Sequence, residues 1–325
     1  MSYATLLRHL VHEADGLGTG DAGQLFGALL DGGVPEMEMG ATLMALAVRG
    51  ETDSEWAGFV RALEARQHFL RWPVSGATRP LVIPSYCGTR DQFNLVPLFV
   101  LLLVKFGIPV LVHGSLESQG RMTTAHVLRE LGILPCASLT QANEALSRDG
   151  LAFVPTAVIA PGLAHLLAQH ARIGVRGTAH ELVKLLAPFR GDALRVIGVQ
   201  DEAQLDRMRR RLADSSAHAL LLVGTEGEAI ANSHRRPRLW HCSRGVCQML
   251  FEAEVGSEQV PLHLPVGQSV TAIADWIRES LAGHHALPMP MLNQIACCLY
   301  GTGRCPDMNQ AKATVAMEIA HLTAV

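Results

Sequence analysis

The stretch LVIPSYCGTRDQFNLVPLFVLLLVKFGIPVLVHG, residues 81–114, decides the fold class of this 325-residue chain. Residues 81–86 form a short apolar run that predicts a buried strand, and residues 92–106 have the length and composition of a buried helix. Gly107 and Pro109 end that helix, and residues 109–113 predict a second strand. Two strands joined by a helix form a βαβ unit, so we expect a parallel sheet.

Helical patterns precede this unit, and further strand patterns follow it. Residues 2–70 carry apolar side chains at helical spacing, and Thr52–Glu55 has the sequence of a capping box. After helical patterns over about residues 140–190 come strand candidates at 193–199, 219–223, 238–241 and 258–261, with a helix at 202–213. We therefore predict an α/β protein with a small N-terminal all-α domain, residues 1–75, and a larger α/β domain, residues 76–325, with a mainly parallel central sheet. The helices from about residue 140 to 190 are expected to pack on the N-terminal domain.

The composition is that of a globular protein whose positive charge is confined to one part of the chain. Hydrophobic residues make up 49% of the sequence, and the formal net charge is −3 at pH 7. The chain as a whole therefore lacks the basic character of a polyanion-binding protein. Residues 151–250, however, contain 13 Lys and Arg against 8 Asp and Glu, a net charge of +5, and the remainder carries −8.

The sequence favours a cytoplasmic protein. The most apolar stretch, residues 95–112, is interrupted by Lys105, Gly107 and Pro109, so we expect no membrane span and no membrane partner. The N-terminal residues lack the pattern of a signal peptide. Seven cysteines without metal-site spacing are typical of a reducing compartment, and no HExxH or paired CxxC motif predicts a metal site. We expect Cys242 and Cys247 to be structural residues.

Several segments are similar to anthranilate phosphoribosyltransferases. Residues 44–58, MALAVRGETDSEWAG, resemble that family's ALR-KGET-EE-AG segment, and Gly88-Thr89 followed by Phe93-Asn94 resembles its phosphate loop. His113-Gly114 and Gly174-Val175-Arg176 match two further family segments, and Leu292-Asn293 matches its C-terminal LNAA helix. Because these matches span nearly the whole chain, the resemblance implies the anthranilate/nucleoside phosphoribosyltransferase fold.

The resemblance breaks at the family's chemical groups. The phosphate loop is four residues shorter here, and the two hydroxyl residues after it are replaced by Val96 and Pro97, which removes a backbone donor. Val112 stands at the position of a phosphate-binding lysine, and His170 at that of the arginine that pairs with the anthranilate carboxylate. We therefore interpret this region as a degenerate phosphate site formed by Gly88, Thr89, Arg90, Asn94, His113 and Gly114, with no catalytic residue assigned.

The family's magnesium segment is also altered. It aligns with residues 226–230, where Ala229 and Ile230 supply no oxygen ligand, although Glu226 and Glu228 are candidates for a shifted Mg²⁺ site. We expect no cofactor, and Mg²⁺ only if the chain is an enzyme.

The remaining pattern resembles the YbiB branch of this family. That resemblance implies a homodimer formed through the helical domain that binds DNA or RNA without sequence specificity. The alternative is a glycosyltransferase, a phosphoribosyltransferase related to that of tryptophan biosynthesis, with an altered substrate. A structural or regulatory dimer that binds only another protein is a third hypothesis.

Basic side chains supply candidate phosphate contacts for the nucleic-acid hypothesis. One cluster lies on the predicted helix 202–213, a second follows the glycine-rich turn at residues 224–227, and a sparser series begins near residue 172. Trp240 is the candidate for stacking on bases. Ordinary surface charge, balanced by nearby Asp and Glu, is the alternative for each cluster. The candidates are Arg207, Arg210, Arg211, Arg235, Arg236, Arg238, Arg244, Arg172 and Arg176, with Trp240.

Overall fold

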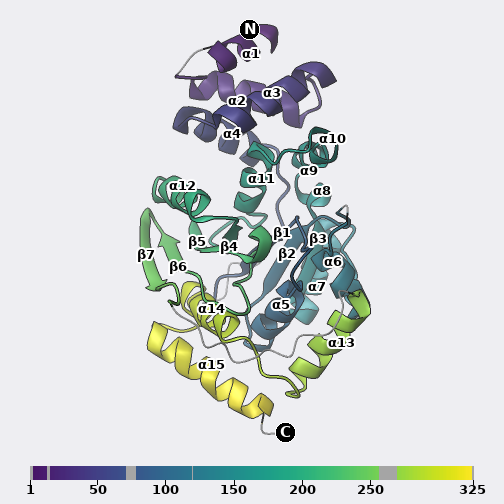
Figure 1. Cartoon of the computed structure of the whole chain (residues 1–325), viewed down its shortest axis with the longest axis vertical. Helices are drawn as coiled ribbons and strands as arrows, with labels where there is room; N and C mark the ends of the chain where they lie inside the picture. The colour runs from purple at the N-terminus through teal and green to yellow at the C-terminus, as the bar shows by residue number, and fades with distance from the viewer. Residues whose placement is uncertain (1–2, 13–14, 71–77, 119, 256–268, 324–325) are drawn as a thin grey trace. The chain divides into compact units, whose positions relative to one another are not determined.

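The computed structural model describes residues 3–12, 15–70, 78–118, 120–255 and 269–323. The chain forms two compact units, Met1–Phe69 with Thr156–Pro188, and Leu70–Pro155 with Phe189–Val325. The first is helical and the second contains the sheet (Figure 1), which confirms the predicted fold class. Of the helices between residues 140 and 190, those from Thr156 onward belong to the first unit, whereas the helix Leu139–Asp149 belongs to the second. The predicted strand at 258–261 and the predicted boundary at residue 75 lie outside the described residues.

The first unit is built around two helices that pack closely. The rings of Phe26 and Phe59 have centroids 4.7 Å apart, and both side chains are fully buried. Gly58 permits this approach, because a Cβ there would lie 2.5 Å from the carbonyl oxygen of Thr19. Thr52 begins the helix of Phe59 with the predicted capping box. The elements of this unit are α1 (Tyr3–His12), α2 (Thr19–Leu30), α3 (Glu36–Arg49), α4 (Asp53–Glu64), α8 (Thr156–Ile159), α9 (Pro161–Ala168), α10 (His170–Ile173), α11 (Thr178–Leu182) and η1 (Val183–Leu185).

The second unit contains a seven-stranded sheet in the order β3-β2-β1-β4-β5-β6-β7. The first five strands in this order run parallel, and the last two pairs are antiparallel. The chain reverses direction across the sheet between β1 and β4, because β2 and β3 lie on one side of β1 and the later strands on the other. The strands are β1 (Leu81–Ser85), β2 (Val110–Gly114), β3 (Leu151–Pro155), β4 (Leu194–Val199), β5 (His218–Val223), β6 (Leu239–Ser243) and β7 (Val246–Phe251).

Both faces of this sheet are covered by helices, as the strand burial requires. Alternate strand residues such as Ile83, Val112 and Val196 join one large core with residues of α5, α6, α13 and α14. On the other face, the buried residues Leu205 and Met208 belong to α12, which contacts β4 to β7. The helices are α5 (Val96–Lys105), α6 (Thr124–Glu130), α7 (Leu139–Asp149), α12 (Glu202–Ala213), α13 (Val270–Leu281), α14 (Met289–Gly301) and α15 (Met308–Thr323), with η2 (Thr225–Gly227). No helix in the described part of the chain is both long enough and apolar enough to cross a membrane.

Only one of the two strands of the β6–β7 hairpin at the sheet edge was predicted from the sequence (Figure 1). The strand expected at 238–241 is β6, but β7 was missed because VCQMLF lacks a β-branched run. Arg244 and Gly245 form the two-residue turn with φ values of 50° and 80°, the left-handed backbone of tight hairpin turns. Cys242 and Cys247 face each other across the hairpin and form a disulfide, a bond that was not predicted from the sequence.

Candidate functional site

The candidate site lies at the carboxyl ends of the parallel strands, beside the point where the chain reverses direction between β1 and β4. Open α/β sheets commonly bind ligands at such a point. Three segments meet here: the loop after β1, residues 86–95, the loop after β2, residues 115–118 and 120–123, and the turn after β5, residues 224–230. Hydrogen bonds between these segments define the site.

Glu226 is the centre of this arrangement. Its carboxylate accepts hydrogen bonds from three consecutive backbone N–H groups, those of Arg90 at 3.0 Å to each oxygen, Asp91 at 2.9 Å and Gln92 at 3.0 Å. Partial burial acts to raise the pKa of Glu226, but these hydrogen bonds and the charge of Arg121 outweigh it and lower the pKa below its ordinary value. Consecutive N–H groups that converge on one point form an anion-binding concavity. In this chain the anion is a carboxylate of the protein itself.

Arg121 connects the same carboxylate to the loop after β1. Its Nη2 donates to Oε2 of Glu226 at 2.6 Å and to the carbonyl oxygen of Gly88 at 2.9 Å, while Nε donates to the carbonyl oxygen of Cys87 at 2.9 Å. The side chains of Arg121 and Glu226 are each 16% exposed, so the ion pair is largely shielded from water. Arg121 is not among the residues predicted from the sequence, because no local pattern marks a single arginine that pairs with a glutamate 105 residues away.

Glu228 is buried and bonds to the beginning of the same loop. Its Oε1 accepts hydrogen bonds from the backbone N–H groups of Cys87 at 2.9 Å and Gly88 at 2.7 Å. Burial raises the pKa of Glu228 above its ordinary value, although the hydrogen bonds from Ser85, Gly88 and Cys87 act in the other direction. The two glutamates thus occupy five backbone donors of residues 87–92 between them.

Two glycines allow the turn after β5 to reach this position. A Cβ on Gly224 would lie 1.8 Å from the carbonyl oxygen of Glu228, and a Cβ on Gly198 would lie 2.1 Å from the same atom. Any larger residue at these positions would push Glu228 away from the loop.

The residues of the predicted degenerate phosphate site lie together, but most of their polar groups are used within the protein. Gly88 and Arg90 donate to the two glutamates. Thr89 exchanges two backbone hydrogen bonds with Met122, whose carbonyl oxygen also accepts from the side chain of Asn94.

His113 and Gly114 end strand β2 in this region. His113 is completely buried, and this burial lowers its pKa to about 3, so the ring is neutral at physiological pH. Gly114 packs against Ser85 of β1 so closely that a Cβ would lie 1.7 Å from the Ser85 carbonyl oxygen. Its role is therefore to allow the close approach of β1 and β2.

The segment aligned with the family's magnesium ligands does not fit Mg²⁺. This ion prefers hard oxygen ligands in octahedral geometry together with several waters. Glu226 already accepts from four donors, Glu228 is buried with a raised pKa, and Ala229 and Ile230 are buried apolar residues. Within the described ranges no three His, Cys, Asp or Glu side chains are grouped to hold a metal.

The predicted basic residues of the second unit are partly exposed and partly paired. On α12, Arg207 and Arg210 are exposed and Arg211 is half-buried. Around the hairpin, Arg235 and Arg244 are exposed, whereas Arg238 pairs with Glu202 at 3.4 Å. The Arg236 guanidinium lies 5.1 Å from the centre of the Phe251 ring. Trp240 is covered by a guanidinium, since Arg209 lies 4.9 Å from the centre of its ring, which leaves that face unavailable for stacking on bases.

The hairpin turn joins two of these groups. A Cβ on Gly245 would lie 3.1 Å from the carbonyl oxygen of Ala213, so the turn that carries Arg244 contacts the carboxyl end of α12. This end carries Arg210 and Arg211 in its last turn. We give the name α12 basic face to three exposed side chains: Arg210 in the last turn of α12, Arg207 one turn before it, and Arg244 in the hairpin turn.

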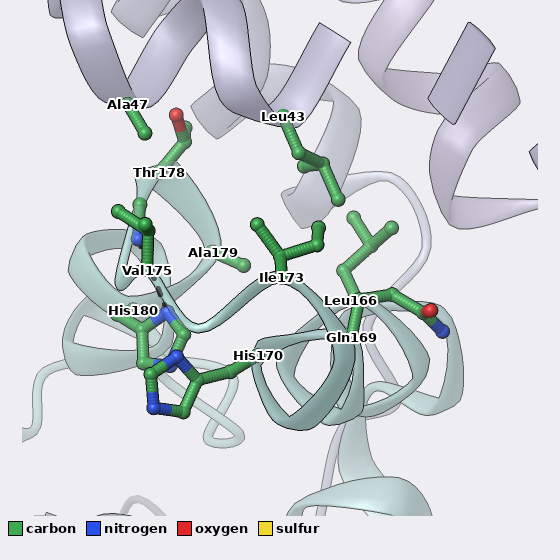
Figure 2. A pocket seen from close by; sticks show the side chains of 11 residues that line it. Leu43, Ala47, Leu166, Gln169, His170, Ile173, Val175, Thr178, Ala179 and His180 are labelled. Atoms are coloured by element: carbon green, nitrogen blue, oxygen red, sulfur yellow. Dashed lines mark hydrogen bonds between the residues drawn. The ribbon is translucent and has the colours of Figure 1, made fainter. Parts of the chain in front are cut away.

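Arg172 and Arg176 belong to the first unit. Arg172 pairs with Glu36 at 3.2 Å on an exposed surface. Near both lies a pocket lined by Leu43, Ala47, Leu166, Gln169, His170, Ile173, Val175, Gly177, Thr178, Ala179 and His180 (Figure 2). His170 and His180 stack edge to face 5.2 Å apart, and burial lowers the pKa of His180 to about 3. A neutral histidine and apolar side chains therefore line the place at which the resemblance puts a substrate carboxylate.

Arg79 and Arg195 were not among the predicted basic residues, although they act on the same buried histidine as the predicted Arg244. Arg79, Arg195 and Arg244 all act to lower the pKa of His218, which burial lowers most, and Asp192 opposes them. These residues surround the amino ends of β4 and β5, the edge opposite the carboxylate cluster. They come from separate segments, so only the fold brings them together.

Known proteins share this architecture. The model of the glycosyl transferase family, helical bundle domain, matches residues 4–66. The crystal structure of anthranilate phosphoribosyltransferase (TrpD) from Thermus thermophilus superimposes with a TM-score of 0.78 and 26% sequence identity, covering 98% of this chain and 94% of that one. The curated anthranilate phosphoribosyltransferase of Thermus thermophilus is 26% identical over 297 residues, 90% of this chain and 88% of that protein.

A more similar sequence is YbiB of Escherichia coli (strain K12), described as an uncharacterized protein. It is 37% identical over 295 residues, which cover 90% of both chains. These names support the glycosyltransferase alternative better than nucleic-acid binding, which none of them mentions. The fold, the matched segments and this extended identity show that the chain belongs to the anthranilate phosphoribosyltransferase-like family and is a relative of YbiB.

Proposed function

We propose that this chain binds nucleic acid without sequence specificity through its α12 basic face, and that it does not transfer a phosphoribosyl group. The proposal concerns the phosphodiester backbone of DNA or RNA, because guanidinium groups pair with phosphate oxygens and do not depend on base sequence. We also propose, from the family resemblance, that the protein is a cytoplasmic homodimer formed through the helical unit, which light scattering of the purified protein tests.

One observation supports the proposal most directly. The exposed side chains of Arg207, Arg210 and Arg244 form no ion pair with any described residue, although acidic residues lie nearby. Asp206 pairs with Arg209 and Glu202 pairs with Arg238, and Asp214, at the carboxyl end of α12, forms no ion pair with any of the three arginines. Three exposed guanidinium groups on α12 and the adjoining hairpin turn, without acidic partners among the described residues, favour a polyanionic partner.

The test is a fluorescence anisotropy titration of labelled single-stranded and duplex oligonucleotides at salt concentrations from about 50 to about 300 mM. We expect the logarithm of the binding constant to fall linearly with the logarithm of salt, by about 0.9 per neutralised phosphate for a duplex. The variant R207E/R210E/R244E should bind every sequence at least tenfold more weakly. The matched control K105E/R129E/R148E changes the net charge equally at exposed positions elsewhere in the second unit and should retain more affinity. A binding constant that does not change with salt concentration contradicts the proposal, and so do equal losses of affinity in the two variants.

The second candidate function is phosphoribosyl transfer with an altered substrate. The relatives named anthranilate phosphoribosyltransferase favour it. Against it, Glu226 fills the anion-binding donors, and the aligned magnesium segment does not fit the ion. Calorimetry with phosphoribosyl pyrophosphate and Mg²⁺ separates the two functions, since saturable binding by the unmodified protein would support the enzyme.

A further inference from the structure

The loops after β1 and β2 together form an anion cradle that is already filled. Its donors are the backbone N–H groups of Arg90, Asp91 and Gln92 together with the Arg121 guanidinium. All four reach the carboxylate of Glu226 within 3.0 Å. We use the name anion cradle for these four donors.

An oxyanion with several oxygens would accept hydrogen bonds from all four donors. A carboxylate offers two oxygens and one negative charge, and Oε1 of Glu226 alone accepts from all three backbone groups. Phosphate or diphosphate offers more oxygens and more charge to the same convergent N–H groups and guanidinium. Residues 90–92 are exposed, so an anion from solvent could reach the cradle if the carboxylate were absent.

The backbone at Glu226 is in a conformation that glutamate rarely adopts. Its φ and ψ angles are 51° and 26°, in the left-handed region, and it is one of two non-glycine residues with positive φ among those described. Such strain persists where the surrounding contacts hold the residue in place. Here those contacts are the hydrogen bonds from the four donors of the cradle, so it is the carboxylate that holds Glu226 in this conformation.

We propose that Glu226 is an internal anion that occupies the cradle and excludes free phosphate and diphosphate from it. The short turn 224–227, which follows β5, then holds the loops after β1 and β2 together through Glu226. This inference does not depend on nucleic-acid binding, because the cradle and the α12 basic face share no residue.

The test is a gain of binding when the carboxylate is removed. The variants are E226G and E226N, since glycine and asparagine tolerate the left-handed backbone, and the control is E144A, which removes one exposed glutamate of α7 and changes the net charge equally. Inorganic pyrophosphate is titrated into each protein with EDTA present, and binding is followed by calorimetry and ³¹P NMR. We expect no saturable binding by the unmodified protein or by E144A at millimolar ligand, and binding at least tenfold tighter by E226G and E226N.

A second substitution identifies the site. Adding R121A to E226G should remove the gain, because the guanidinium is one of the four cradle donors. The proposal is overturned if both Glu226 variants are folded by circular dichroism and still bind no pyrophosphate, or if the unmodified protein binds it as tightly as they do. Oligonucleotide titrations of the same variants should stay within twofold of the unmodified protein, so failure here and failure of the proposed function give different results.

Discussion

The guanidinium of Arg121 and the carboxylate of Glu226 lie 2.6 Å apart, from Nη2 to Oε2, across 105 residues of sequence. This pair joins the loop after β2 to the turn after β5, and Arg121 also donates to the carbonyl oxygens of Cys87 and Gly88 in the loop after β1. Three loops at the carboxyl edge of the sheet are therefore held by one arginine and one glutamate.

Substitution of Arg121 should destabilise the second unit through the loss of this pair. R121A should lower the free energy of unfolding by about 2 kcal/mol, because it removes charge-assisted hydrogen bonds and leaves a largely shielded carboxylate without its cation. Urea unfolding of R121A, E226Q and the double variant measures the coupling, which we expect to be about 1–2 kcal/mol. R129A, at an exposed arginine of α6, is the control and should change stability by less than about 0.5 kcal/mol. Additive effects of the two single variants would show that the pair does not stabilise the fold.

Two positive-φ residues should respond in opposite ways to the same substitution. Asparagine relieves part of the left-handed strain, which costs about 1 kcal/mol for most residues. At Arg244, in the hairpin turn with φ of 50°, R244N should raise the free energy of unfolding by up to about 1 kcal/mol. At Glu226, E226N should lower it, because the loss of the four carboxylate contacts exceeds the relief of strain. Chemical unfolding of both variants decides this, and stabilisation by E226N would mean that the carboxylate contributes little.

Glu228 should make the folded protein less stable as pH rises, whereas most carboxylates in folded proteins have the opposite effect. Its pKa is raised in the folded state by burial, so the folded protein holds this proton more tightly than the unfolded chain. The stabilisation from this group is complete below the ordinary glutamate pKa of 4.5 and is lost as pH rises through the raised pKa of the folded state. E228Q keeps an acceptor for Cys87 and Gly88 and lacks the ionisation, so its stability relative to the unmodified protein should increase as pH rises. Unfolding curves at several pH values between about 4 and 8 measure this difference, and a constant or falling difference contradicts it.

Reduction of the Cys242–Cys247 disulfide should destabilise the β6–β7 hairpin. The two cysteines are five residues apart, and the chain-entropy model assigns a loop of this size about 2 kcal/mol. The melting temperature of the unmodified protein should fall on addition of a reductant, whereas that of C242S/C247S should not respond. Mass spectrometry of protein purified without reductant supplies a direct check, since seven free thiols would mean that the bond does not form.

The sequence predicted the elements that depend on local patterns. The βαβ stretch at residues 81–114, the capping box at Thr52 and the helix 202–213 are all present, because apolar periodicity and caps are properties of neighbouring residues. β7 was missed, since its six residues carry no alternation strong enough to indicate an edge strand. The resemblance located the degenerate phosphate site, but it did not identify the residues that form hydrogen bonds with the loop after β1.

The sequence by itself determined the fold class and the position of the altered loop after β1, because both are recorded in the order and spacing of residues along the chain. Only the tertiary structure decided what occupies that loop. Glu226, Glu228 and Arg121 are separated from it by roughly 30 to 140 residues, and their hydrogen bonds depend on the parallel strands that bring the three loops to one edge of the sheet. Contacts of this kind arise from packing over long sequence distances, which no pattern within a single segment encodes.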